Sequence, residues 1–267
     1  MFFLYVLFAF ICEFVDSALG MGYGTTLTPL LLLIGFNPLQ VVPAILFSEF
    51  VTGILAAIFH HKFGNASFDF GKDEKVAAGK LRFLGYLPRS EDAKVSYILV
   101  ILGILGVVSA VIFSLNVPKI VLNLYIGLMI FFIGVYIIFK INRPSEFNWK
   151  NFSIIAILSG FNKGVSGGGY GPLVTGGQVV TGRGAKNAVG STSLAEGIIC
   201  LVGFLLYLLL KGNIEWTLAW PLLIGAVLST PLSAFTVKKI RERKMKLIIG
   251  VVTVMLGILT IIKLFLK

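Results

Sequence analysis

Charged residues are scarce in this chain of 267 residues, where Asp, Glu, Lys and Arg make up 13%, about half the share typical of a soluble domain. Hydrophobic residues make up 57%, and the mean hydropathy is +0.95. Lipid must therefore be the solvent for most of the chain. This composition excludes a soluble enzyme and a nucleic-acid-binding domain, and it predicts a lipid bilayer as the surroundings.

Cysteine and histidine are almost absent. The two cysteines, Cys12 and Cys200, lie in apolar stretches and have no spacing typical of a disulfide framework or a metal site. The two histidines, His60 and His61, are adjacent, and the chain has no P-loop. We therefore expect no metal, no cofactor and no ATP-driven step.

Long apolar runs predict an all-α polytopic membrane protein. A helix needs about 20 predominantly apolar residues to cross a bilayer. Six runs reach roughly that length, and two of them carry one carboxylate each, Glu49 and Glu196. The predicted spans are Val41–Phe59, Val95–Leu115, Ile120–Phe139, Asn187–Leu210, Trp216–Val237 and Leu247–Leu266.

Two more apolar segments, Phe2–Phe36 and Phe152–Gly182, are each broken midway by glycines. Their second arms, Thr25–Phe36 and Leu173–Thr181, would rise only about 14–18 Å, which is too short to cross. Irregular backbone at membrane depth is tolerated only inside the protein or along a cavity. Each segment is therefore predicted to form a re-entrant helical hairpin.

Basic residues concentrate in four loops, which hold 18 of the 23 Lys and Arg residues. The opposite side holds four, and Lys163 lies within the predicted membrane region. Such asymmetry marks the cytoplasmic side of a membrane protein. It predicts a protein of the inner cell membrane with both termini outside. The cytoplasmic loops are then residues 61–94, 140–150, 183–186 and 238–246.

The chain is similar to itself at a shift of 147 residues, without a gap. Each half contains one hairpin and three spans, and three is odd, so the second half must be inverted relative to the first. We expect one transporter domain over residues 1–267, with repeats at 1–139 and 152–267 and a binding site between them near the midplane. The matching pairs are Phe14/Phe161, Gly20/Gly167, Gly22/Gly169, Tyr23/Tyr170, Gly24/Gly171, Thr28/Thr175, Gly35/Gly182, Val42/Val189 and Glu49/Glu196.

The two glycine clusters are predicted to bind a small anionic solute. Glycines let the backbone approach a ligand closely, and the helix N-terminus that follows favours an anion. Close helix packing through small residues is the other interpretation of the same glycines. The predicted substrate-binding residues are Gly20, Gly22, Tyr23, Gly24, Thr25, Lys163, Ser166, Gly167, Gly168, Gly169, Tyr170 and Gly171.

Lys163 is the only basic residue within the predicted membrane region, and a buried cation needs a partner. Either it binds the substrate anion or it pairs with Asp16, its repeat equivalent, or with Glu13. Together with Glu49 and Glu196 these are four acids against one base, a net charge of −3 if all are ionised. Some are therefore expected to hold a proton, and all four are predicted to serve proton coupling or gating.

The stretches Gly20-Met-Gly-Tyr-Gly24, followed by Pro29, and Ser166-Gly-Gly-Gly-Tyr-Gly-Pro172 resemble the TauE/SafE family of membrane anion permeases, the sulfite exporters. The resemblance implies export of sulfite or organosulfonate-like anions. We expect this secondary transport to proceed by alternating access. An inside-negative potential favours anion exit by about 2.3 kcal/mol per charge per 100 mV.

Three alternatives to anion export remain open from the sequence. The chain could take up a similar anion with protons as the coupling ion, through Glu49 or Glu196. It could be a membrane scaffold or a subunit without transport activity. The stretch Gly164-Val-Ser166-Gly167 also matches intramembrane serine proteases, but that chemistry needs a base to take the serine proton, and no suitable one is evident. The sequence therefore favours a transporter over an enzyme, and it leaves the oligomeric state open.

Overall fold

The computed structural model describes most of the chain, including every residue of the two glycine clusters. The predicted span Ile120–Phe139 and the loop 140–150 fall largely outside the described residues. The described residues are 1–36, 38–72, 86–113, 128, 131–132, 135–136, 138–139 and 149–265.

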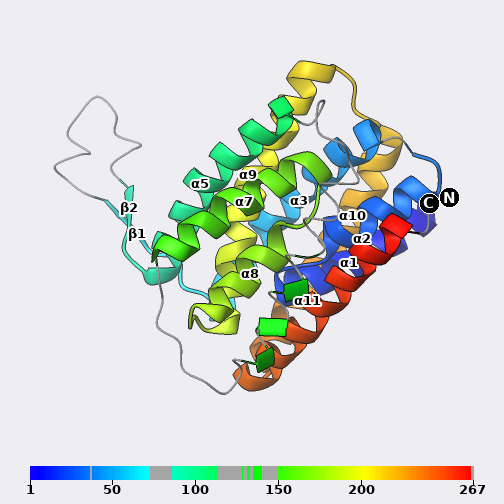
Figure 1. The fold of residues 1–267 in the computed structure, drawn as a ribbon. Helices are drawn as coiled ribbons and strands as arrows, with labels where there is room; N and C mark the ends of the chain where they lie inside the picture. The colour runs from blue at the N-terminus through cyan, green and yellow to red at the C-terminus, as the bar shows by residue number, and fades with distance from the viewer. Residues whose placement is uncertain are drawn as a thin grey trace.

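The described part of the chain is a bundle of helices with one short pair of strands (Figure 1). Within the described residues, five helices, which begin at Phe2, Pro38, Glu91, Ala185 and Trp216, are long and apolar enough to cross a membrane, which confirms an all-α polytopic membrane protein. Strands β1 (Phe70–Lys72) and β2 (Tyr86–Pro88) pair antiparallel, with Phe70 opposite Pro88. The helices are α1 (Phe2–Leu19), α2 (Tyr23–Leu33), α3 (Pro38–Lys62), α5 (Glu91–Phe113), α7 (Trp149–Ser166), α8 (Tyr170–Val180), α9 (Ala185–Lys211), α10 (Trp216–Lys239) and α11 (Glu242–Phe265).

Both glycine clusters break a helix into a long arm and a short arm. In each case an arm of 18 residues is followed by an arm of 11 residues, α1 then α2 and α7 then α8. Gly20 and Gly167, which match at the 147-residue shift, both adopt φ +69°, a left-handed conformation that favours glycine. The predicted breaks are therefore present. The short arms begin at Tyr23 and Tyr170, slightly earlier than expected.

Helices α3 and α9 pack against each other and form the central pair of the bundle. Helix α10 packs on α3 and also lies along α1, while α5 packs on α9 and also lies along α7. Glycines let these helices approach closely: a Cβ atom on Gly53 of α3 would lie 2.7 Å from the Cα atom of Gly197 of α9. The contact between α3 and α9 consequently brings their buried side chains together at the middle of the bundle.

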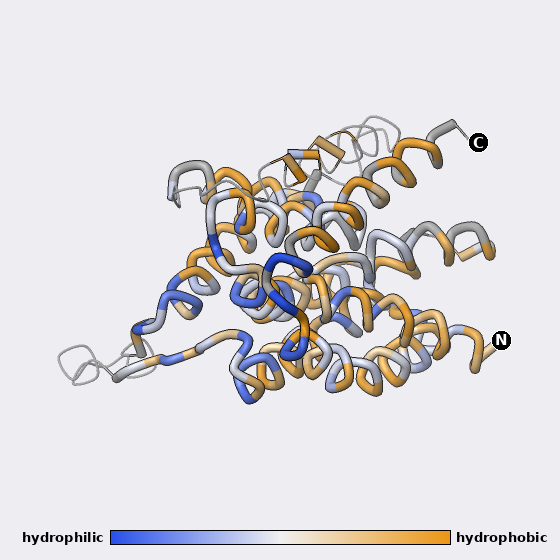
Figure 2. Tube along the Cα trace, turned by 90° about the horizontal axis from the view of Figure 1, so that it is seen from below, coloured by the Kyte–Doolittle hydropathy of each residue, from blue (hydrophilic) through white to orange (hydrophobic). Residues whose placement is uncertain are grey.

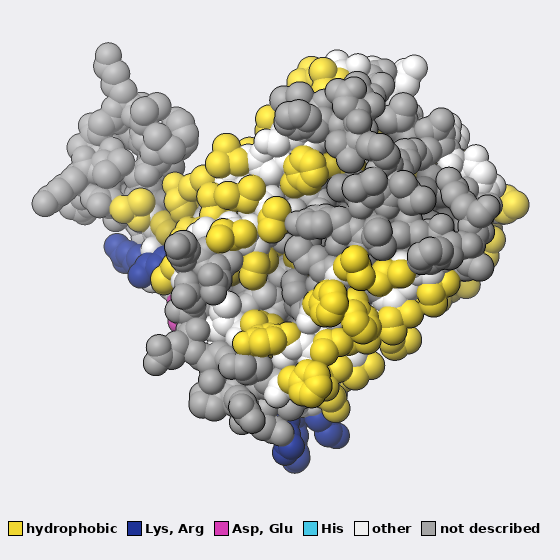
Figure 3. Space-filling model, viewed as in Figure 1, with side chains coloured by type: hydrophobic (Ala, Val, Ile, Leu, Met, Phe, Trp, Pro, Cys, Tyr) yellow, Lys and Arg dark blue, Asp and Glu magenta, His cyan; other side chains and the backbone are white. Residues whose placement is uncertain are grey.

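The outward faces of the bundle are apolar. On α10, exposed Trp220, Ile224 and Leu228 follow one another at intervals of one helical turn. The opposite face of α10 is buried and includes Ala226 and Ser229. Hydrophobic side chains likewise cover much of the described face in Figure 3. This pattern is what a helix between lipid and a protein interior requires.

The two ends of the bundle differ in polarity. Helix α1 begins and α11 ends at the same end of the molecule (Figures 1 and 2). Hydrophilic turns gather at the opposite end (Figure 2). The segments 183–186 and 238–246 lie at that end in Figure 1, and Lys186 Nζ donates to the Lys238 carbonyl at 2.9 Å. These basic loops and the chain termini thus lie at opposite ends of the folded molecule.

Asp92, in the first turn of α5, ties together three segments at this hydrophilic end. It pairs with the guanidinium of Arg183, which follows α8, and its other oxygen accepts bonds from Asn187 Nδ2 (2.9 Å) and the Ser67 amide (2.8 Å). Arg183 and Asp92 are both buried. Burial lowers the pKa of the Arg183 guanidinium from its ordinary value, and the Asp92 carboxylate opposes that shift. The pair therefore fixes the end of α8 to α5.

Replacing Arg183 with Met is expected to destabilise the protein by about 2–3 kcal/mol. This is the low end for breaking a buried ion pair, because Asp92 keeps two other donors. The measurement is the unfolding temperature of the detergent-solubilised protein. The double variant Arg183→Met/Asp92→Asn should recover most of the loss, since it leaves no unpaired charge. A double variant no more stable than the single one would show that Arg183 acts through packing alone.

Candidate transport site

The two glycine breaks lie directly against each other. A Cβ atom on Gly24 would lie 1.8 Å from the carbonyl oxygen of Gly167, and one on Gly171 would lie 2.2 Å from that of Gly20. Both distances are far below any real contact, so only glycine allows this crossing. Gly24 and Gly171 are also equivalent under the 147-residue shift. The two breaks therefore cross each other in the described structure.

Threonine hydroxyls join the two breaks. Thr175 Oγ1 on α8 donates to the carbonyl of Gly20 at 3.0 Å, and Thr28 Oγ1 on α2 donates to the carbonyl of Ser166 at 3.3 Å. Thr28 and Thr175 are repeat equivalents, and each satisfies a carbonyl left free where the opposite long arm ends. Each short arm is therefore bonded to the break at the end of the opposite long arm.

Amide donors at both breaks already have partners within the protein. The amide of Tyr23, the first residue of α2, donates to Asp16 Oδ1 at 3.0 Å. The amide of Gly169, which precedes α8, donates to Thr25 Oγ1 at 3.0 Å. An anion that binds these amides must first displace a side chain. The glycines thus serve close packing in this conformation, which is the second of the two interpretations drawn from the sequence.

Lys163 of α7 lies between two glutamates. Its Nζ atom is 2.5 Å from Glu49 Oε2 and 2.6 Å from Glu196 Oε1, and all three side chains are buried. The expected pairing of Lys163 with Asp16 or Glu13 is therefore wrong about the partner. Because α3 and α9 pack closely, their equivalent glutamates reach the same ammonium, and Asp16 is held by the Tyr23 amide. Lys163, Glu49 and Glu196 are called the charge triad below.

Cys200 was not among the residues predicted for the site. Its thiol lies 3.7 Å from Glu49 Oε2, beside the charge triad, and it is buried. Cys200 follows Glu196 by four residues, so the two share one face of α9. That spacing, together with the carboxylate at Glu196, is the sequence signal that could have placed it here.

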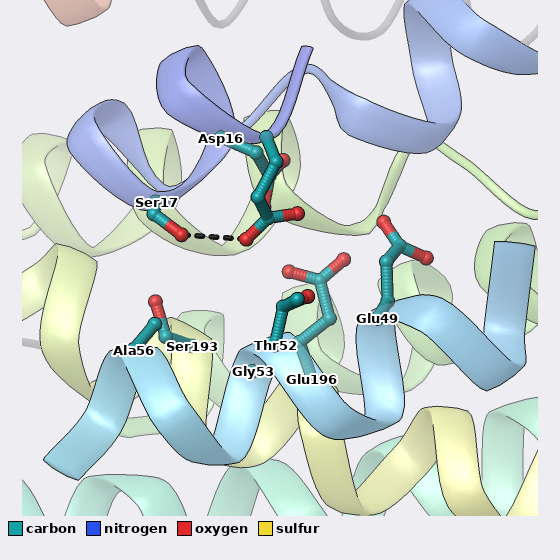
Figure 4. Close-up of a pocket in the computed structure, with 9 residues that line it drawn as sticks. Asp16, Ser17, Glu49, Thr52, Gly53, Ala56, Ser193 and Glu196 are labelled. Atoms are coloured by element: carbon teal, nitrogen blue, oxygen red, sulfur yellow. Dashed lines mark hydrogen bonds between the residues drawn. The ribbon is translucent and has the colours of Figure 1, made fainter. Parts of the chain in front are cut away.

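A small cavity adjoins the charge triad, and all four predicted intramembrane acids line it (Figure 4). Its volume accommodates about one water molecule. Ser17 Oγ donates to Glu13 Oε1 at 2.6 Å, while Glu13 Oε2 and Glu49 Oε1 have no partner among the described residues. The lining residues are Glu13, Asp16, Ser17, Glu49, Thr52, Gly53, Ala56, Ser193 and Glu196.

Four carboxyl groups line the cavity, and two of them, Glu49 and Glu196, contact the Lys163 ammonium. Two unit charges 4 Å apart interact by about 4 kcal/mol at an effective dielectric constant of 20. If all four carboxyl groups were ionised, the net charge of −3 would strongly oppose the entry of an anion. Protons on some of these carboxyl groups would lower that cost.

The tyrosines of the two breaks are both buried but differ in their contacts. Tyr23 Oη lies 2.9 Å from Ser48 Oγ, whereas Tyr170 Oη has no hydrogen-bond partner among the described residues. Gly22 and Gly168 are buried at the breaks as well. The predicted residues of the breaks thus lie together at the crossing, but none of them lines the cavity.

The sequence is similar to a known protein family over most of its length. The family described as Sulfite exporter TauE/SafE matches residues 5–72 and 81–260. A protein of Bacillus subtilis (strain 168) described as "Probable membrane transporter protein YtnM" is 26% identical over 275 residues, which cover 96% of this chain and 82% of the relative. No solved structure matches the chain significantly.

Proposed function

Because the chain belongs to the TauE/SafE sulfite exporter family and is a multi-pass membrane transporter, we propose that it exports small sulfur-containing anions, sulfite or an organosulfonate, by alternating access. The observation that carries the proposal is the buried ammonium of Lys163 beside the crossing of the two glycine breaks. An oxyanion at this depth needs a positive partner, and Lys163 offers a full charge there.

Alternating access requires two halves that exchange roles, and the packing supports two inverted repeats. By order along the chain, α1 corresponds to α7, α3 to α9 and α5 to α10. Under this correspondence the contact between α1 and α10 is equivalent to the contact between α7 and α5. Both contacts are extensive. The central pair α3 and α9 maps onto itself. A transporter that rocks one repeat against the other would open the central cavity alternately to each side.

The polarity of the bundle supports one orientation in the inner cell membrane. The hydrophilic end carries basic loops and would face the cytoplasm, which leaves both termini outside. In the described conformation the cavity has room for about one water molecule, too little for an oxyanion. The helices around it would have to move apart before an oxyanion could bind there.

Transport by the purified protein in liposomes tests the proposal. We expect sulfite or an alkylsulfonate to exchange about tenfold faster than acetate, because a site built for a sulfur oxyanion discriminates by shape and hydrogen bonding. The measurement compares sulfite, methanesulfonate, thiosulfate, sulfate and acetate at a fixed potential and pH gradient. Liposomes without protein serve as the control. Fluxes equal to that control for all five anions would contradict transport and favour a scaffold role.

Proton-coupled uptake of a similar anion is the second candidate function. The observation that favours it is the convergence of Glu13, Asp16, Glu49 and Glu196 on one cavity. Both candidates use the same site, and the gradients of anion and proton decide the direction of net flux. In the liposome assay, uptake driven by an acidic exterior in the absence of an anion gradient would identify the second candidate.

A further inference from the structure

We propose that transport by this chain is electroneutral: the anion takes over the ammonium of Lys163, and Glu49 and Glu196 together bind one proton for each negative charge that the anion carries. This inference rests on the proposed function and adds its coupling ion, its stoichiometry and the residues that set it. It also predicts that the membrane potential does not drive the export.

The geometry of the charge triad requires an exchange. The Lys163 ammonium contacts Glu49 at 2.5 Å and Glu196 at 2.6 Å, and its side chain is 1% exposed. With both contacts in place, an anion at the ammonium would meet two carboxylates within a few ångströms. The anion must therefore displace at least one glutamate from Lys163.

A displaced glutamate cannot stay ionised at little cost. Glu49 and Glu196 are 2% and 4% exposed, and a buried carboxylate without a cation is strongly unfavourable. Binding a hydronium proton from the aqueous phase to the carboxylate oxygen removes that cost and leaves a neutral carboxylic acid. A monoanion then replaces one carboxylate, and a dianion replaces both. In either case the triad and its bound anion together carry −1, the charge that the triad alone has with both glutamates ionised.

The neighbouring titratable groups do not lose a partner in this exchange. On α1, Glu13 is bonded to the Ser17 hydroxyl and Asp16 to the Tyr23 amide, and neither pairs with Lys163. Tyr170 of α8 and Cys200 of α9 also lie near the triad. No charged residue of α5 or α10 lines the cavity. The two triad glutamates are thus the groups whose protonation follows the anion.

The decisive measurement is the accumulation of labelled methanesulfonate in proteoliposomes at equilibrium. This probe is a monoanion whose charge does not change near neutral pH. Electroneutral coupling predicts the same accumulation at 0 and at 100 mV, set with a potassium gradient and valinomycin. It also predicts a change of about tenfold for each unit of pH gradient. An uncoupled monoanion would instead change about 50-fold per 100 mV.

The variant Glu49→Gln/Glu196→Gln tests the assignment to these two residues. It preserves the shape of both side chains and removes both proton sites. We expect methanesulfonate still to cross, now with an accumulation that changes about 50-fold per 100 mV and ignores the pH gradient. Glu91→Gln is the matched control, since Glu91 is exposed on α5 and should leave the coupling unchanged.

The possible results distinguish a failure of electroneutral coupling from a failure of the proposed transport function. Accumulation that follows the potential in the unmodified protein would overturn electroneutral coupling and leave anion transport intact. Coupling to pH that survives in the double variant would overturn the assignment to Glu49 and Glu196. A complete lack of anion flux in the unmodified protein would overturn the proposed function, and this inference with it.

Discussion

Replacement of Lys163 by Met is expected to abolish anion binding and to destabilise the protein by about 3–5 kcal/mol, the cost of breaking a buried ion pair in a soluble protein. The change leaves Glu49 and Glu196 buried without their cation. The measurements are the unfolding temperature in detergent and the calorimetric binding of sulfite. Lys163→Arg should keep part of the binding, because it keeps the charge but not the geometry.

A compensated variant distinguishes stability from recognition. In Lys163→Met/Glu49→Gln/Glu196→Gln the charge triad becomes neutral, and we expect the unfolding temperature to recover most of its loss. Sulfite binding should remain absent, because no other buried cation adjoins the cavity in the described part of the chain. Binding that returned with stability would place anion recognition on the amides and hydroxyls of the glycine breaks. It would reduce Lys163 to a structural partner of the two glutamates.

Replacement of Gly24 by Ala is expected to prevent folding. The added Cβ atom would lie 1.8 Å from the carbonyl oxygen of Gly167, and backbone at this crossing cannot retreat without moving both short arms. The destabilisation should exceed about 4 kcal/mol, the range reached only by severe core defects. Gly171→Ala should behave similarly, because its Cβ atom would lie 2.2 Å from the Gly20 carbonyl oxygen. The measurement is the yield of monodisperse protein after extraction.

The control for these changes is Gly203→Ala in the middle of α9. There the nearest atoms are side-chain methyl groups of Leu46 and Val107, at 3.2 and 3.3 Å, which can shift slightly. Alanine also favours a helix over glycine by about 1 kcal/mol. We expect near-normal yield from this variant. A normal yield and normal transport from Gly24→Ala would mean that the two breaks do not cross as closely as described.

Hydrophobic patterning by itself determined the class of the protein and most of its elements. The predicted spans at Val41–Phe59, Asn187–Leu210 and Trp216–Val237 correspond to α3, α9 and α10 within a few residues at each end. The reason is that lipid imposes one simple requirement, about 20 apolar residues with every backbone group bonded inside the helix. The breaks could also be predicted, because glycine alone adopts the left-handed conformation of Gly20 and Gly167 at little cost.

Which side chains meet was decided only by the tertiary structure. The sequence placed Lys163 and four acids in the membrane, but the repeat matched Lys163 with Asp16 and so pointed to the wrong pair. The partner depends on how closely α3 and α9 pack and on which donors are already occupied; here Asp16 accepts the Tyr23 amide, and both glutamates reach Lys163. Local periodicity reports which face of a helix is buried. It carries no information on the distance between two buried faces. At this site that distance determines which carboxylates contact the Lys163 ammonium.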